Sequence, residues 1–136
     1  MGDGAYLFDP QGDLRSSMVY PCRENCTDPN GPALRLTARY RGREAVQIVN
    51  TGATPIDLEP YRLVSKPYGY SFAPNSVIDP GEVMRVRLYE SAQDDSRLIR
   101  YWATNGPILN NGGDVVQLRR YDDVIAACTS WGSRSC

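Results

Sequence analysis

The sequence predicts an all-β protein, an antiparallel β-sandwich of seven to nine short strands. Three observations lead to this fold class. The 12 Gly and 10 Pro residues are spread along 136 residues, so few intervals leave room for a long helix. Between these breaks, apolar and polar residues alternate with the period of a half-buried strand. A hydrophobic fraction of 41% at this length is sufficient for the core of one domain.

The individual strands follow from this alternation. Leucines alternate with arginines over residues 34–41, and the pattern continues over 44–50 after a turn at Gly42. The next strand begins at Ile56 and resumes after Pro60, because proline cannot donate a hydrogen bond to the ladder. Asp-Pro-Gly-Glu and Asn-Asn-Gly-Gly-Asp turns separate the later strands, which are expected at residues 70–73, 84–88, 116–118 and 124–129.

Two parts of the chain are less regular. The interval 90–102 is expected to be a long loop with either a short strand or a helical turn, since its apolar residues fit both periods. Residues 1–32 are expected to form an N-terminal extension with one or two edge strands. This extension would pack on the sandwich of residues 33–136, so that both parts make a single structural domain.

The four cysteines fall as two local pairs near the chain ends, Cys22 with Cys26 and Cys128 with Cys136. Disulfides within each pair are favoured because neighbouring thiols have a high effective concentration, and such bonds would clamp both terminal extensions. Cross-pairing, a four-cysteine zinc site and free thiols are the alternatives. Disulfides indicate an oxidising compartment, so we expect a secreted or cell-surface protein whose signal peptide lies outside this sequence. No apolar run is long enough to span a membrane as a helix.

The chain contains no histidine, which excludes Ser-His-Asp and Cys-His catalytic centres and imidazole metal sites. No other residue set specifies a reaction, so a non-enzymatic protein without a cofactor is predicted. The net charge of -1 argues against a general polyanion-binding protein, although a basic patch can be local. All 15 cationic residues except Lys66 are arginine, a bias typical of GC-rich bacterial genomes.

Three sets of side chains are candidates for binding. Outward-facing arginines would hold a phosphate or carboxylate ligand, or form a solvated face paired with acidic residues. Aromatic residues near loops would form an interface, stack on sugars, or line the rim of the core. Paired aspartates would bind Ca²⁺ or form turns. The sets are Arg35, Arg39, Arg41, Arg85 and Arg87, joined by Arg43 and Arg119 if their strands share a sheet; Tyr68, Tyr70, Tyr101 and Trp102; and Asp94, Asp95, Asp122 and Asp123.

The order of several turns and strands resembles one known family. Residues 44–52, Glu-Ala-Val-Gln-Ile-Val-Asn-Thr-Gly, look like a strand that ends in an Asn-Thr-Gly-type turn of the lamin tail domain. Residues 78–82 resemble the Pro-Gly-Glu turn of that family, and residues 109–118 resemble its polar Asn/Gly turn with Asp leading into a strand. The resemblance covers about residues 33–128.

This resemblance implies an immunoglobulin-like sandwich that has no catalytic residues and offers an interaction surface for protein or DNA. Two positions depart from the family pattern: Tyr61 stands where Trp is frequent, and Asp123 where Gly is usual. The terminal extensions are similar to those of exported actinobacterial proteins that carry this domain. We therefore expect an extracellular interaction module that contacts a protein or a cell-wall polymer. A nucleic-acid-binding module that uses the arginines, and a Ca²⁺-dependent adhesion or carbohydrate-binding module, are the alternatives.

Overall fold

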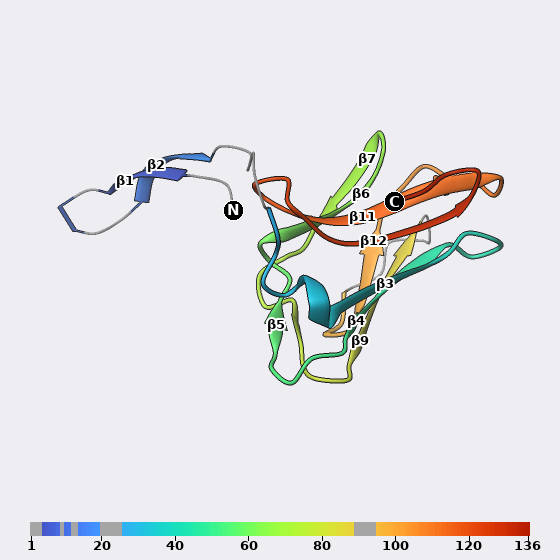
Figure 1. The fold of residues 1–136 in the computed structure, drawn as a ribbon, viewed down its shortest axis with the longest axis horizontal. Helices are drawn as coiled ribbons and strands as arrows, with labels where there is room; N and C mark the ends of the chain where they lie inside the picture. Colours follow the sequence, from blue (N-terminus) through green and yellow to red (C-terminus); the bar gives the residue numbers. More distant parts are fainter. Residues whose placement is uncertain (1–3, 9, 12–13, 20–25, 89–94) are drawn as a thin grey trace.

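A computed structural model of the chain describes residues 4–8, 10–11, 14–19, 26–88 and 95–136, with the backbone alone for 4–8 and 14–19. The strands are β1 (Gly4–Phe8), β2 (Leu14–Val19), β3 (Leu34–Arg39), β4 (Ala45–Asn50), β5 (Ile56–Asp57), β6 (Tyr61–Ser65), β7 (Tyr68–Ser71), β8 (Val77–Ile78), β9 (Val83–Leu88), β10 (Ile99–Trp102), β11 (Gly113–Arg120) and β12 (Ile125–Gly132). A 3-10 turn, η1 (Gly31–Ala33), precedes β3 (Figure 1).

Two four-stranded sheets form the sandwich (Figure 1). One sheet has the strand order β10-β9-β4-β3, and the other has the order β12-β11-β6-β7. The short strands β5 and β8 pair with each other in a separate two-stranded sheet. Neighbouring strands are antiparallel in every described pair except β9 and β10, which run parallel. The predicted all-β sandwich is confirmed, with one parallel pair that the sequence did not indicate.

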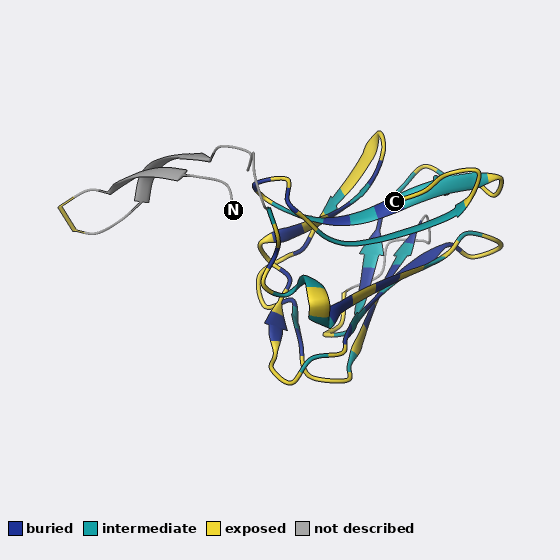
Figure 2. Ribbon diagram, viewed as in Figure 1, coloured by how far each residue is buried: buried dark blue, intermediate teal, exposed yellow. Residues whose placement is uncertain are grey.

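The apolar residues that alternate along the strands meet between the two sheets (Figure 2). The central side chains, each with 0% exposure, are Val46 and Ile48 on β4, Met84, Val86 and Leu88 on β9, Leu63 on β6, and Val116 and Leu118 on β11. Along each strand they are two residues apart, as the pleat requires. Burying one such side chain contributes roughly 1.5–3 kcal/mol, so this interior is the main source of the fold's stability.

The irregular interval 90–102 ends in a strand, so the short-strand alternative is correct. Residues Ile99–Trp102 form β10 at the edge of the first sheet, beside β9. The indole of Trp102 is only 6% exposed and lies 5.7 Å, centroid to centroid, from the ring of Tyr70 on β7, the edge strand of the other sheet. Burial of this large ring between two edge strands explains why residues 99–102 form a strand and not a helical turn.

The two ends of the chain are described to different extents. β1 and β2 form a hairpin of their own, which lies to one side of the sandwich in Figure 1. Its side chains are outside the described part of the structure, so the expected packing of residues 1–32 stays a prediction. Cys22 is outside it too, and the pairing of Cys22 with Cys26 also stays a prediction. At the other end, the predicted disulfide between Cys128 and Cys136 is present, with their Cα atoms 6.0 Å apart.

A buried asparagine joins two turns at one end of the first sheet. Asn50 has 0% exposure, and its Nδ2 donates to the carbonyl oxygens of Thr54 (2.8 Å) and Ile78 (3.0 Å). Its Oδ1 accepts from the backbone N–H of Gly52 at 2.9 Å. The backbone of Asn50 also bonds to Gly81 and Glu82, in the turn before β9. Asn50 therefore fixes the 51–55 turn against the 79–82 turn.

The substitution Asn50→Asp should destabilise the protein strongly. It keeps the size of the side chain and the Oδ1 bond to Gly52, but it replaces the donor with an acceptor that faces two carbonyl oxygens. We expect a loss of about 2–4 kcal/mol in the free energy of unfolding, measured by denaturant titration. Asn110→Asp is the matched control, because exposed Asn110 makes the same Oδ1 bond to a glycine N–H two residues on. Equal losses in the two variants would contradict this role of Asn50.

A second polar cluster holds the segment before β3 against the other sheet. The side chain of Asp28 has no exposed surface and accepts from Oη of Tyr61 at 2.9 and 3.0 Å. Nη1 of Arg120 lies 3.4 Å from the same carboxylate, and Arg120 also pairs with Asp122. Asn30 donates to Oη of Tyr61 at 3.1 Å. Burial, with a smaller effect from the adjacent Asp28, raises the pKa of Tyr61 to about 12.

Because the folded protein holds the phenolic proton of Tyr61 more tightly than the unfolded chain, Tyr61 should make stability fall at high pH. Its contribution is complete below about pH 10, the ordinary tyrosine pKa, and is lost as the pH rises through about 12. We expect Tyr61→Phe to cost about 1–2 kcal/mol at neutral pH and to flatten the alkaline decline in stability. The exposed-site control Tyr68→Phe should leave neutral-pH stability unchanged. Burial also raises the pKa of Tyr70, so part of the alkaline decline should remain, and a decline in Tyr61→Phe as steep as in the unmodified protein would contradict the assignment.

Candidate functional site

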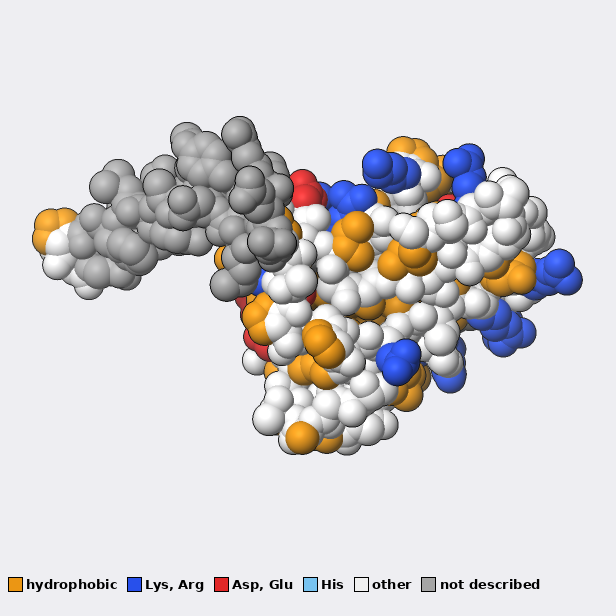
Figure 3. All heavy atoms as spheres, viewed as in Figure 1, with side chains coloured by type: hydrophobic (Ala, Val, Ile, Leu, Met, Phe, Trp, Pro, Cys, Tyr) orange, Lys and Arg blue, Asp and Glu red, His pale blue; other side chains and the backbone are white. Residues whose placement is uncertain are grey.

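The first sheet turns a row of arginines outward. Arg39 on β3 and Arg87 on β9 flank Ala45 of β4 in the strand register, one on each side. Since Ala45 carries only a methyl group, a hollow of about 410 Å³ opens between them. We call this surface the Arg face; it comprises Arg35, Arg39, Arg41, Arg43, Arg85 and Arg87. Figure 3 shows Lys and Arg side chains gathered over the half of the sandwich where the β3–β4 turn lies.

A glutamine in the hollow orients one of these arginines. Gln47 lies opposite Arg85 in the pairing of β4 with β9. When its amide oxygen faces the guanidinium, that oxygen accepts from Nε of Arg85 at 3.2 Å and from Nη2 at 2.9 Å. Arg85 is exposed and lines the hollow. Gln47 was not predicted as a site residue, although its outward position between Val46 and Ile48 follows from the period-two pattern.

Except for Arg134, the described arginines outside the Arg face have acidic partners. The pairs are Arg62 with Asp123, Arg97 with Glu82 and Asp79, Arg100 with Asp95, Arg119 with Asp123, and Arg120 with Asp28 and Asp122. In one of them, the hydrogen bond from Arg97 lowers the pKa of Glu82. Among the described residues, by contrast, no carboxylate pairs with Arg35, Arg39, Arg41, Arg43 or Arg85. The described acidic residues therefore do not neutralise these five arginines, and the function of the Arg face stays a prediction.

The one carboxylate that borders the hollow is already occupied. Glu44 is 2% exposed, and its side chain accepts from the backbone N–H groups of Ile108 (3.0 Å) and Leu109 (3.2 Å). These bonds satisfy the buried charge and tie the start of β4 to the loop before β11. Glu44 thus helps to shape the hollow without pairing with its arginines. No signal in the sequence near Glu44 distinguished it from an exposed acid.

The structure separates one expected member of the arginine set. Arg119 lies on β11 in the second sheet, so it does not join the Arg face. Arg43 does join it, because it lies in the turn that borders the hollow. The exposed guanidiniums, each with a planar set of donors, suit phosphate or carboxylate groups.

The candidate aromatic residues do not form one surface. Tyr68 on β7 is 45% exposed, whereas Trp102 is buried between the sheets. Half-buried Tyr70 lies beside Trp102, with ring centroids 5.7 Å apart, and the interface predicted for Tyr68, Tyr70, Tyr101 and Trp102 stays a prediction, with Trp102 as its least accessible member. At the opposite edge of the sandwich, Tyr40 stacks on Trp131 with ring centroids 4.4 Å apart, a contact that was not predicted.

The candidate calcium ligands are held by other groups. Asp122 is buried in its pair with Arg120, and Asp123 pairs with Arg62. Oδ1 of Asp95 accepts from the backbone N–H of Tyr101 at 2.9 Å, and Asp94 lies outside the described residues. In the part of the chain that the structure describes, no three acidic or cysteine side chains come together as metal ligands. A Ca²⁺ site therefore has no geometric support in that part.

Comparison with protein families agrees with this architecture. The Lamin Tail Domain family model matches residues 24–133, a wider stretch than the motifs alone indicated. This family has an immunoglobulin-like fold and serves as a binding module. A search of curated proteins gave no match to the chain. Among the described residues, no helix is long and apolar enough to cross a membrane. From its fold, its turns and this match over most of its length, the chain belongs to the lamin tail domain family.

Proposed function

We propose that this domain is a non-catalytic extracellular interaction module, and that its Arg face binds an anionic partner of the cell envelope. The observation that carries the proposal is the set of five arginines that have no carboxylate partner among the described residues. Outside the Arg face, every described arginine except Arg134 has an acidic partner. Unpaired like charges on one sheet repel each other, and an anionic ligand removes that cost.

The form of the Arg face favours an extended partner. Arg39, Arg85 and Arg43 surround the hollow, while Arg35 lies farther along β3 and Arg41 lies in the β3–β4 turn. The guanidiniums thus follow the sheet surface over several strands. A polymer with repeated phosphate or carboxylate groups would meet several of them at once, and multiple contacts would raise its affinity.

Two further features support an extracellular, non-catalytic role. The disulfide between Cys128 and Cys136 suits an oxidising compartment. The chain has no histidine, and the buried acids Asp28, Glu44 and Asp122 all have hydrogen-bonding or ionic partners that hold them in place. A general acid or base would need a group whose proton is exchanged near neutral pH.

The proposal predicts that binding depends on the Arg face and on salt. We would titrate the protein with polyphosphate and with polyglutamate at low and high salt, and follow binding by calorimetry. The double variant Arg39→Gln/Arg85→Gln should lose roughly tenfold or more in affinity, because it removes two charge-assisted contacts. The matched control Arg62→Gln/Arg97→Gln removes the same net charge from paired arginines and should bind like the unmodified protein.

Three outcomes would contradict the proposal: no binding to either polymer at low salt, equal losses in both double variants, or affinity that is insensitive to salt. A duplex DNA titration tests the alternative partner. If DNA binds much more tightly than both polymers, and the Arg39→Gln/Arg85→Gln variant loses that binding, the Arg face is a nucleic-acid surface and an envelope partner is excluded.

A further inference from the structure

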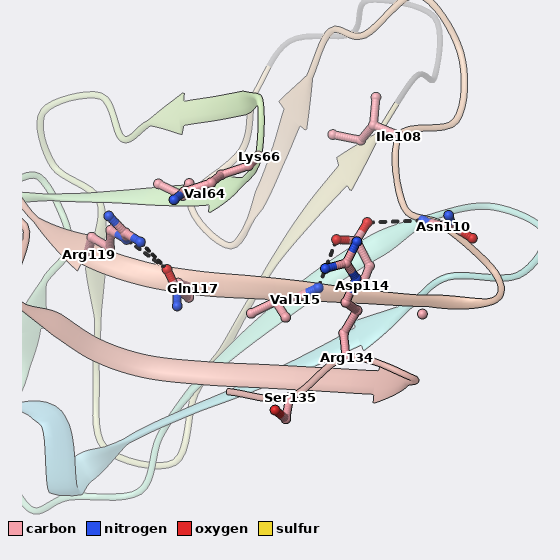
Figure 4. A pocket seen from close by; sticks show the side chains of 11 residues that line it. Val64, Lys66, Ile108, Asn110, Asp114, Val115, Gln117, Arg119, Arg134 and Ser135 are labelled. Atoms are coloured by element: carbon pink, nitrogen blue, oxygen red, sulfur yellow. Dashed lines mark hydrogen bonds between the residues drawn. The ribbon is translucent and has the colours of Figure 1, made fainter.

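The outer face of the second sheet carries another hollow, of about 480 Å³ (Figure 4). Its floor is formed by Gln117 and Val115 on β11 and by Val64 on β6. One wall is the C-terminal segment with Arg134, and Lys66 from the β6–β7 turn stands on the opposite side (Figure 4). We call this hollow the tail groove. It lies on the sheet opposite the Arg face and shares no residue with it.

The tail groove exists because the chain reverses after β12. Gly132 has a φ of 63°, and a Cβ at this position would come within 2.0 Å of the carbonyl oxygen of Gly112, so only glycine fits the reversal. The segment then returns to β12, where Cys136 is bonded to Cys128. The side chain of Cys128 is on the strand position opposite Gln117. The disulfide therefore keeps Arg134 at the edge of the groove.

Three cations line this groove, and they are not equivalent. The guanidinium of Arg119 is pre-oriented, because Nε and Nη2 both donate to Oε1 of Gln117, at 2.8 and 2.5 Å. Its distance to the carboxylate of Asp123 is long, 3.9 Å. Lys66 and Arg134 form no ion pair with any carboxylate among the described residues. Two cations are thus available at the rim, and a third is held in a fixed orientation along the floor.

One carboxylate, Asp114, also lines the groove, on the side of Arg134 (Figure 4). Its oxygens accept from the backbone N–H groups of Val115 (2.8 Å) and Asn110 (3.1 Å). These bonds hold the 110–114 turn and leave Asp114 committed to the backbone. Among the described residues, the charged side chains around the groove are three cations and one anion, so their summed charge is positive although the chain has a net charge of -1.

We propose that the tail groove binds a small anion, a phosphate or carboxylate group on a compact molecule or at a chain end. Gln117 takes the Nε–Nη2 edge of Arg119, which leaves the remaining N–H groups of Nη1 and Nη2, in a fixed orientation, as donors for such a group. Lys66 lies toward the Arg119 end of the groove, and Arg134 lies at the other end, beside Asp114 (Figure 4). Because Arg134 is held by the Cys128–Cys136 disulfide, binding requires the oxidised tail. The site is independent of the Arg face, so either one can fail without the other.

Calorimetry with inorganic pyrophosphate and with citrate tests this site and separates the two anion chemistries. We expect the unmodified protein to bind at least one of them. Arg134→Gln should weaken that binding by roughly tenfold, since it removes one charge-assisted contact. Arg41→Gln, which removes the same charge from the Arg face, should leave it unchanged. The double variant Cys128→Ser/Cys136→Ser should remain folded, as judged by its melting curve, and should bind as weakly as Arg134→Gln.

Absence of binding to both anions, or equal binding by Arg134→Gln and the unmodified protein, would overturn the proposal. Equal weakening by Arg41→Gln would also overturn it, because the effect would then reflect net charge alone. If the double cysteine variant fails to fold, the Arg134→Gln comparison still decides. Loss of polyphosphate binding in Arg39→Gln/Arg85→Gln, with pyrophosphate binding intact, would assign the two ligands to separate faces.

Discussion

The buried amide of Asn50 is the constraint on which the first sheet depends. Its Nδ2 donates to the carbonyl oxygens of Thr54 and Ile78, and its Oδ1 accepts from the N–H of Gly52. These bonds fix the 51–55 turn against the 79–82 turn, because any other arrangement would leave a buried polar group unpaired. The observed arrangement sets the register of β4 against β9. A shift of one residue would reverse every side chain of β9 and send its arginines into the core. The outward position of the Arg-face side chains on β9 therefore depends on the buried hydrogen bonds of Asn50, which lies outside the Arg face.

Local patterns made most of the fold predictable. Alternation over 34–41 and 84–88 identified β3 and β9 and placed their arginines outward, because a strand's period of two is decided by neighbours in sequence. The parallel pairing of β10 with β9 could not be predicted from alternation, because it depends on the burial of Trp102 against Tyr70 of the other sheet. The burial of Asp28 was equally hidden, because its partners Tyr61 and Arg120 are distant in sequence.

The candidate sites were predictable to different degrees for the same reason. The Arg face required only that β3 and β9 belong to one sheet, whereas Arg119 was separated from it by the sheet order. The tail groove, in contrast, forms only because a chain reversal and a disulfide bring Arg134 to the second sheet. Neither feature follows from a periodic sequence pattern, so the groove could not be predicted. Both surfaces are lined by cationic side chains near solvent, so the attraction that each exerts on an anion should weaken as the salt concentration rises.

The two surfaces differ in their relation to the family fold. The Arg face is built on β3, β4 and β9, within the matched residues 24–133. Arg134 and Cys136 lie beyond that match, and they reach the second sheet through a bond to Cys128 inside it. The sandwich thus supplies a rigid platform on both sides, since its apolar core does not involve the tail. A short disulfide-bound segment adds Arg134 and Ser135 to a strand face on which Gln117 already orients Arg119, and so completes the groove for which we propose an anion.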